Sequence, residues 1–303
     1  MERMEVSPGA WQEAREVLKG AYDLHVHSGP SIFPRRADDW QVLAEAEAAG
    51  MAGVGLKAHE GDTAGRARVL GQKATGCEVY GGVALNHFVG GINPAAVEAS
   101  LKLGGRIVWL PTLSARQHVR YYRGLERAFL GGEFKHTAGE GFEVVDENGR
   151  PTPAMEDVFE LVSAGGAVLS TGHLSPGEAL AVARAYRQVK RDGNIVMGHA
   201  DLIINQASLA EQQEFVRLGG YVEKCVLALN KAWGGVALED YAAGIRKVGV
   251  ERCLLTSDAG GPDRPSSPET LARFLAAVLA RKLLTADELR VMLVAVPRRL
   301  LGR

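Results

Sequence analysis

The feature that most constrains the fold of this chain is a repeated order of elements: a short apolar strand and then a helix, about every thirty residues. The predicted strands lie at residues 21–28, 53–59, 77–85, 106–111, 167–173, 194–200, 220–226 and 252–258. The predicted helices lie at residues 38–49, 62–74, 93–105, 154–164, 176–191, 208–218, 238–248 and 268–281, with a closing helical pair from residue 285. Such alternation predicts an α/β fold, a single-domain (β/α)8 TIM barrel over residues 1–303. A doubly wound open sheet is the alternative.

Two segments depart from this rhythm. Residues 1–20 read as an N-terminal helical segment. Residues 113–153 form an insertion after the fourth strand that is far longer than an ordinary loop between a strand and a helix. This insertion contains His118 and ends in a hairpin-like stretch with a turn at Asn148-Gly149. We interpret it as a lid that binds an anionic or aromatic substrate; a solvated face or a subunit contact explains the same residues.

Composition limits the classes of partner. The formal net charge of −1 gives no electrostatic case for nucleic acid or an anionic membrane. No uninterrupted apolar run reaches membrane-spanning length. Cys77, Cys225 and Cys253 each stand alone in apolar stretches, which predicts buried thiols. With no signal-peptide pattern at the amino terminus, we expect a cytoplasmic homo-oligomer that acts on a small molecule.

The first strand carries an unusual pair of imidazoles, His25 and His27. Regular alternation places them on one face together with Asp23, and turns Leu24 and Val26 toward the helices. Two imidazoles therefore project side by side from the end of one strand.

Polar residues also end the other predicted strands. In a TIM barrel, catalytic groups sit at the carboxyl ends of the strands. The residues at these ends are Lys57, His59, Asn86, His87, Thr112, His173, His199, Glu223 and Asp258. Neutral imidazoles from His25, His27 and His173 with the Asp258 carboxylate form a nitrogen and oxygen set suited to Zn²⁺, with Mn, Fe or Ni as alternatives.

These residues carry a resemblance to a known superfamily. His25-x-His27, His173, His199 and Asp258, in this order, resemble the metal-site pattern of the amidohydrolase superfamily. The ending Val296-Pro297-Arg298-Arg299-Leu300-Leu301-Gly302 is similar to the Asn-Pro-Ala-x-Leu-Leu-Gly closing of many members. The resemblance implies a (β/α)8 barrel, one or two divalent metal ions bound by these five residues, and hydrolysis of amide, ester, lactone or related bonds.

One departure from the superfamily pattern concerns the number of ions. Binuclear members usually take a bridging carboxylated lysine or a glutamate from the fourth strand, and residues 106–112 supply neither. This favours one ion, with two as the alternative. Lys57 is open to three interpretations: a bridging carbamate, a cation or proton donor toward substrate, or an ion-pair partner of Glu223.

The leading hypothesis is hydrolysis by a metal-bound hydroxide that attacks an amide, cyclic amide or lactone carbonyl of a small, carboxylate-bearing substrate. Asp258 relays the proton, His199 binds a second ion or supports the oxyanion, and Lys57 is a third catalytic candidate. The candidate substrate contacts are Arg35, Arg36, His59, Thr112, His118 and Glu223.

Three other functions stay open. Residues 23–28 also resemble the opening of phosphoesterases of the polymerase-and-histidinol-phosphatase (PHP) type, although Leu56-Lys57-Ala58-His59 replaces the Thr-Asp-His expected there. Some mononuclear members of the amidohydrolase superfamily are decarboxylases. A non-catalytic metal-binding barrel is the alternative from another class.

Overall fold

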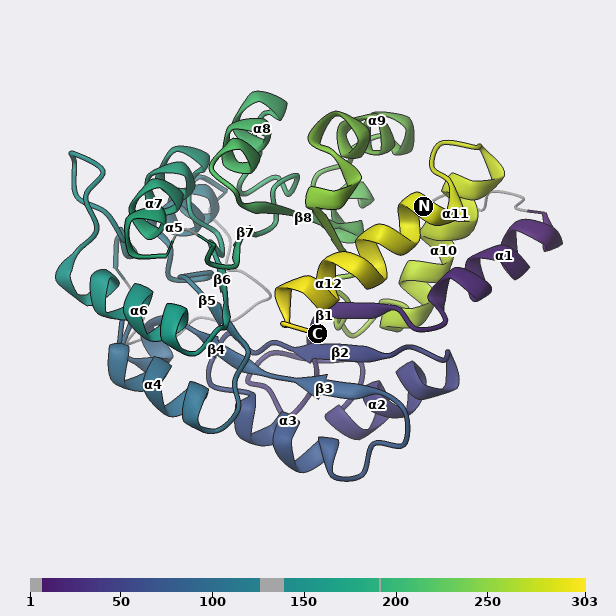
Figure 1. The fold of residues 1–303 in the computed structure, drawn as a ribbon, viewed down its shortest axis with the longest axis horizontal. Coiled ribbons are helices and arrows are strands. Elements are labelled where there is room, and N and C mark those ends of the chain that lie inside the picture. The colour runs from purple at the N-terminus through teal and green to yellow at the C-terminus, as the bar shows by residue number, and fades with distance from the viewer. Residues whose placement is uncertain (1–6, 126–138, 191) are drawn as a thin grey trace.

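The computed structural model describes residues 7–125, 139–190 and 192–303, and it has the predicted barrel architecture, with parallel strands inside and helices outside (Figure 1). The strands are β1 (Tyr22–Val26), β2 (Gly53–Leu56), β3 (Glu78–Tyr80), β4 (Gly82–Ala84), β5 (Ile107–Trp109), β6 (Val168–Ser170), β7 (Ile195–Met197), β8 (Tyr221–Cys225) and β9 (Cys253–Thr256). All neighbouring strands pair in parallel, in the orders β1-β2-β3 and β4 to β9.

The predicted strand at 77–85 is divided into two. Its first half, β3, pairs with β2, and its second half, β4, pairs with β5. Thr63 fills the gap between β2 and β4, since its hydroxyl donates to the Leu56 carbonyl (2.7 Å) and accepts from the Gly82 N–H (3.0 Å). Between the ends of β1 and β9, the backbone N–H of His27 donates to the Ala259 carbonyl over 2.8 Å. The ring is thus joined by loop contacts as well as by sheet pairing.

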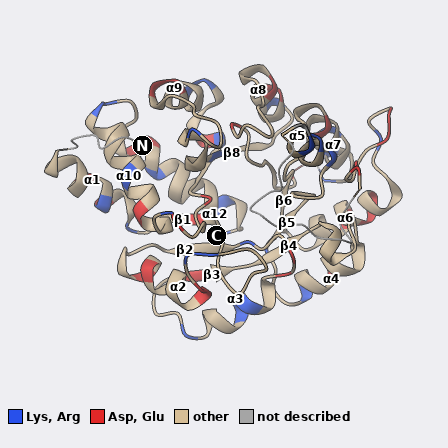
Figure 2. Cartoon of the chain, turned by 180° about the vertical axis from the view of Figure 1, so that it is seen from behind, with Lys and Arg blue, Asp and Glu red and all other residues tan. Residues whose placement is uncertain are grey.

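The helices form the outer layer. They are α1 (Pro8–Leu18), α2 (Asp39–Ala48), α3 (Ala64–Gly71), α4 (Pro94–Lys102), α5 (Arg116–Gly124), α6 (Pro153–Ala164), α7 (Pro176–Val189), α8 (Leu209–Arg217), α9 (Leu238–Val248), α10 (Ser267–Ala280), α11 (Ala286–Arg290) and α12 (Val296–Leu300). Several begin where the sequence predicts, because a polar side chain caps them; Asp38 and Gln41 form a capping box on α2. Acidic and basic residues are interspersed along these helices (Figure 2). Within the described ranges, no helix is both long and apolar enough to cross a membrane.

Two apolar clusters hold the layers together. Inside the ring, Leu24, Trp109 and Leu254 pack against Leu300 and Leu301 at the end of α12. Figure 1 shows α12 lying across the middle of the ring of strands. The outward-facing strand residues form a second, larger cluster with the surrounding helices. The interior of one barrel end is therefore apolar and closed by α12.

The prediction for the first strand is partly wrong. Leu24 packs in the barrel interior and Val26 packs in the outer cluster, so the two residues do not share a face. The reason is a register shift between Asp23 and Val26, which interrupts the alternation. Gly55 on β2 allows this irregular strand to come close, because a Cβ there would lie 2.7 Å from the Leu24 carbonyl oxygen.

The insertion contains a helix that was not predicted. Helix α5 has no side-chain cap at Ala115, and its sequence RQHVRYYRG has few apolar residues, so neither usual signal of a helix is present. The predicted hairpin reduces to one antiparallel bridge between Val145 and Pro151. Residues 1–6 of the predicted N-terminal segment and His136 in the insertion lie outside the described residues. The lid role of the insertion stays a prediction.

Candidate active site

A cavity of about 430 Å³ opens at the carboxyl ends of the strands. Its polar lining includes His27, Arg35, His59, His173, His199, Asn230, Asp258, Asp263 and Arg264, and its apolar lining includes Leu202, Ile204, Leu227 and Trp233. Predicted site residues from several strands therefore meet in one cavity. This end of the barrel differs from the end closed by α12.

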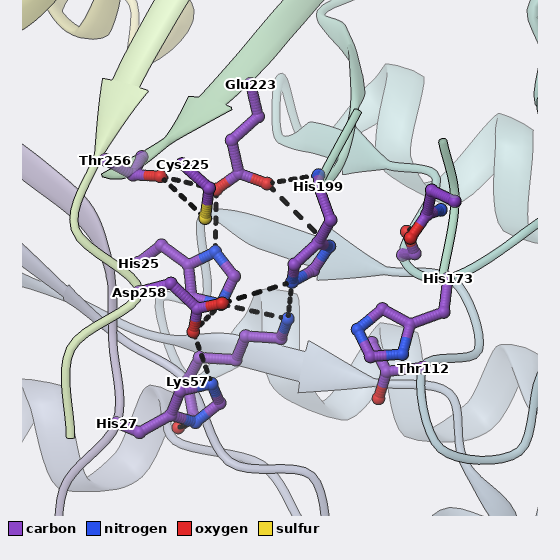
Figure 3. A network of polar contacts seen from close by, with 12 residues as sticks. His25, His27, Lys57, Thr112, His173, His199, Glu223, Cys225, Thr256 and Asp258 are labelled. Carbon is purple, nitrogen blue, oxygen red and sulfur yellow. Dashed lines mark hydrogen bonds and ion pairs between the residues drawn. The ribbon is translucent and has the colours of Figure 1, made fainter. Parts of the chain in front are cut away.

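Asp258 lies at the centre of a group of three imidazoles (Figure 3). Its Oδ1 is 3.2 Å from Nε2 of His25 and 3.2 Å from Nε2 of His27, and its Oδ2 is 3.9 Å from Nε2 of His199. Asp258 and His199 both have positive φ angles, 51° and 53°. A left-handed conformation is uncommon for such residues and is strained, typically by about 1–3 kcal/mol. The backbone is therefore held in a strained form that turns both side chains into the site.

The contacts of His25 and His27 define which nitrogen faces Asp258. Nδ1 of His27 lies 2.9 Å from the Lys57 carbonyl oxygen, which can only accept, so Nδ1 carries the proton. Burial lowers the pKa of His27, so its ring is neutral and the unprotonated Nε2 faces Asp258. Nδ1 of His25 likewise contacts Glu223 Oε1 at 2.6 Å. Two imidazole nitrogens and a carboxylate oxygen thus converge, and this nitrogen and oxygen set fits a bound divalent cation.

Glu223, on β8, contacts both His25 and His199. Its carboxylate accepts hydrogen bonds from the Thr256 hydroxyl (2.9 Å) and the His199 N–H (2.9 Å) as well as from His25. Burial alone would raise the pKa of Glu223, but its interactions with His25 outweigh burial and lower it. Glu223 is therefore charged and orients His25. It is absent from the cavity lining, where the sequence had predicted a substrate contact.

Lys57 is buried between two of the imidazoles. Its Nζ lies 3.1 Å from Nε2 of His25 and 3.3 Å from Nε2 of His199, and burial lowers the pKa of the amine. In the described part of the chain it forms no direct ion pair with Glu223, although the charges of Asp258 and Glu223 act to raise its pKa. Because the amine sits at nitrogens that would hold an ion, it must either move on metal binding or join the ligands.

His173 and His118 form a stacked imidazole pair. Their Nδ1 atoms are 2.7 Å apart and their ring centroids 4.9 Å apart, so one ring donates a hydrogen bond to the other. Burial lowers the pKa of His118 to about 3 and also lowers that of His173, which keeps both neutral. The His173 ring lies 4.5 Å from that of His199, while Figure 3 shows it apart from the contacts around Asp258. His118 thus links α5 of the insertion to a predicted metal ligand.

The remaining predicted contacts fall in different places. Nδ1 of His59 lies 3.0 Å from the Thr112 hydroxyl, which also accepts from the Asn86 amide (2.8 Å). Arg35 lines the cavity, whereas Arg36 is ion-paired with Glu45 on α2 and is absent from the lining. The neighbouring arginines therefore have different environments.

Sequence reasoning missed several residues of this site. Cys225, predicted only as a buried thiol, has its sulfur within 4.8 Å of ligand atoms of His25 and Asp258. Asp23 does not face the site: it accepts from the Ser257 N–H (3.1 Å) and the Ser267 hydroxyl (2.6 Å), which ties β1 to α10. Trp233 and Arg264 come from loops with no motif. Only the turn at Gly260-Gly261-Pro262 marked the second loop in the sequence.

Comparison with known proteins gives a family and a fold. The family described as "Family of unknown function (DUF6282)" matches residues 20–223. No curated protein matches the sequence.

Solved structures match over nearly the whole chain. An amidohydrolase from Pseudomonas aeruginosa is 10% identical, with 97% of this chain and 99% of that chain covered and a TM-score of 0.63. A 2,6-dihydroxybenzoate decarboxylase complexed with 2,6-dihydroxybenzoate is 11% identical, with 94% of this chain and 100% of that chain covered and a TM-score of 0.60. A putative 2-pyrone-4,6-dicarboxylic acid hydrolase from Pseudomonas putida is 16% identical, with 93% of this chain and 97% of that chain covered and a TM-score of 0.55. These similarities confirm the predicted (β/α)8 barrel fold.

Proposed function

Since this chain belongs to the family of unknown function DUF6282 and has the amidohydrolase-type fold, we propose that it is a metal-dependent hydrolase of a small, carboxylate-bearing substrate. The bond cleaved is an amide, cyclic amide or lactone. The observation that carries this proposal is the position of the Asp258 carboxylate, which lies 3.2 Å from Nε2 of both His25 and His27.

His25, His27 and Asp258 would hold the ion, with His199 and His173 as further ligands. A bound divalent ion such as Zn²⁺ lowers the pKa of water and polarises a carbonyl. One ion is favoured, because the loop after β5 offers no carboxylate or lysine at Thr112, only a hydroxyl that His59 and Asn86 already contact.

The protein's own groups would handle the proton and the developing charge. Asp258 lines the cavity, so its carboxylate can accept a proton from the attacking water and return it to the leaving group. His199 would act in one of two ways: as a ligand through an unprotonated Nε2, or, with the proton on Nε2, as a hydrogen-bond donor to an oxyanion. Burial lowers the pKa of His199 to about 3, so the ring is neutral in either case.

Metal content and turnover test this function together. The full chain loaded with Zn²⁺ should retain about one ion and hydrolyse a member of a panel of carboxylate-bearing amides and lactones. Asp258→Asn should lose the activity. Asp263→Asn is the matched control, because Asp263 lines the same cavity but, in the described part of the chain, forms none of the contacts that Asp258 makes with the imidazoles. Undiminished turnover by Asp258→Asn contradicts the proposal.

Decarboxylation is the second candidate. The donor set favours one ion, and a decarboxylase is among the structures with this fold. Release of CO₂ from aromatic acids, without hydrolysis of the panel, would favour this reaction. Phosphoesters in the same panel test the PHP-type alternative, and bound metal without any turnover would favour a non-catalytic barrel.

We also propose that the protein is a cytoplasmic homo-oligomer whose partner is a small molecule. The near-neutral net charge is the supporting observation for the partner. Light scattering of the purified chain would test the oligomer.

A further inference from the structure

Two arginines of the cavity lack acidic partners. Arg35 and Arg264 both line the cavity, and neither has a carboxylate within ion-pairing distance in the described part of the chain. Each guanidinium instead lies over an aromatic ring: Arg35 is 5.7 Å from the Phe33 centroid and Arg264 is 5.5 Å from that of Trp233. An aromatic face holds a guanidinium in place without neutralising it, so its N–H groups stay available.

The Arg35 guanidinium has a buried nitrogen without a hydrogen-bond acceptor. Its Nε donates to the Ser31 hydroxyl at 3.4 Å, but one terminal nitrogen is buried without a partner. A buried charged donor without an acceptor is destabilising. The charge of Glu60 acts to raise the pKa of Arg35, but Glu60 forms no ion pair with Arg35: one oxygen accepts from the Ile32 N–H (3.1 Å), and the other is buried without a hydrogen-bond partner. A carboxylate in the cavity would supply the missing acceptor.

The Arg264 side chain is placed by its loop. The backbone N–H of Arg264 donates to the Gly261 carbonyl over 3.2 Å, which closes a turn after β9. A Cβ at residue 261 would lie only 3.0 Å from Cδ of Arg264, so the arginine stem packs directly on this glycine. The turn and Trp233 together hold the guanidinium at the cavity wall.

The charges of the cavity favour a doubly negative ligand. Arg35 and Arg264 contribute two positive charges, which Asp258 and Asp263 balance in the absence of metal. A divalent ion would leave the cavity with two net positive charges. Leu202, Ile204 and Leu227 provide apolar wall in the same cavity for the body of a ligand.

We propose that Arg35 and Arg264 bind two separate carboxylates of one substrate, so that this cavity takes a small dicarboxylic acid. The apolar body of the acid lies against Leu202, Ile204 and Leu227. The inference rests on the proposed function for the identity of the cavity as the substrate site. Recognition itself does not require turnover.

Calorimetric binding of matched acids tests this inference. The probes are isophthalate against benzoate, and glutarate against butyrate, on the full chain both with and without Zn²⁺. Each dicarboxylate should bind at least about tenfold more tightly than its monocarboxylate, because a second bidentate ion pair is formed. Arg264→Met and Arg35→Met should each reduce the preference to near unity. Arg217→Met is the charge control, since Arg217 pairs with Glu214 on α8.

Three outcomes contradict the inference: no binding of either dicarboxylate, equal affinity within both pairs, or a preference that survives both cavity variants. The third outcome includes a preference for dicarboxylates that requires Zn²⁺ but neither arginine. Arginine-dependent binding without hydrolysis would leave the inference standing and refute the proposed hydrolase. Hydrolysis of amides with a single carboxylate, unaffected by either variant, would refute the inference and leave the proposed hydrolase standing.

Discussion

The two ends of this barrel are built from the same strands and differ in what the strands bury. At the end closed by α12, the interior holds Leu24, Trp109 and Leu254 against Leu300. At the other end, the strands and the loops after them bury imidazoles, an amine and carboxylates. Apolar burial stabilises the first end, whereas the polar groups of the second must satisfy one another. We infer that the closed end stabilises the fold and the open end carries out the chemistry.

The largest expected effect is on activity at the open end. Asp258→Asn should lower kcat/KM by roughly 10²–10⁴-fold, as expected for loss of a general acid and base. The fold should persist, because asparagine tolerates the φ of 51° found at this position. Steady-state kinetics and a thermal melt measure the two quantities. Unfolding of this variant at room temperature would contradict the division of roles.

The closed end should show the opposite response. Leu300→Ala removes a fully buried side chain from the interior cluster and should lower the free energy of unfolding by about 2–5 kcal/mol. Metal content and KM should not change. Urea titration and metal analysis at a temperature where the variant is folded test this prediction, and loss of bound metal would show that the two ends are not separable.

A smaller effect, on metal affinity, is expected where His118 of the insertion contacts His173. His118→Phe keeps a ring against His173 but removes the hydrogen bond between the Nδ1 atoms. Loss of such a supporting contact should weaken Zn²⁺ binding about 10–100-fold. Competition with a chromogenic chelator measures this affinity, and Tyr122→Phe, which keeps the neighbouring ring, serves as the control. Unchanged affinity would show that His118 does not orient a ligand.

The smallest effect lies on the surface, away from both ends. The hydrogen bond from Arg246 lowers the pKa of Glu288 to about 2, from an ordinary value of 4.5. Glu288 therefore contributes stability that is fully present above pH 4.5 and is lost as the pH falls toward 2. Solvent screening limits this contribution to below about 1 kcal/mol. Glu288→Gln should therefore reduce the dependence of stability on pH between pH 4.5 and pH 2. Its loss of unfolding free energy should be larger at pH 7 than at pH 3, and an equal loss at the two pH values would contradict the assignment.

The sequence predicted the barrel because strand and helix periods are local signals, and it predicted the cavity because strand ends meet at one face. It did not predict the turn of Asp23 away from the site, since a register shift depends on contacts between strands. It placed Arg36 and Arg35 together, although Glu45 on α2 engages only Arg36. Arg264 and Trp233 meet only after two loops have folded, so no spacing in the chain identifies them.

Crystallography of the Zn²⁺-loaded protein with anomalous scattering at the zinc edge can locate the bound ion. We expect one strong peak per chain, bound by Nε2 of His25, Nε2 of His27 and a carboxylate oxygen of Asp258. A map without a peak between these three side chains, or with zinc bound only elsewhere, would contradict this expectation.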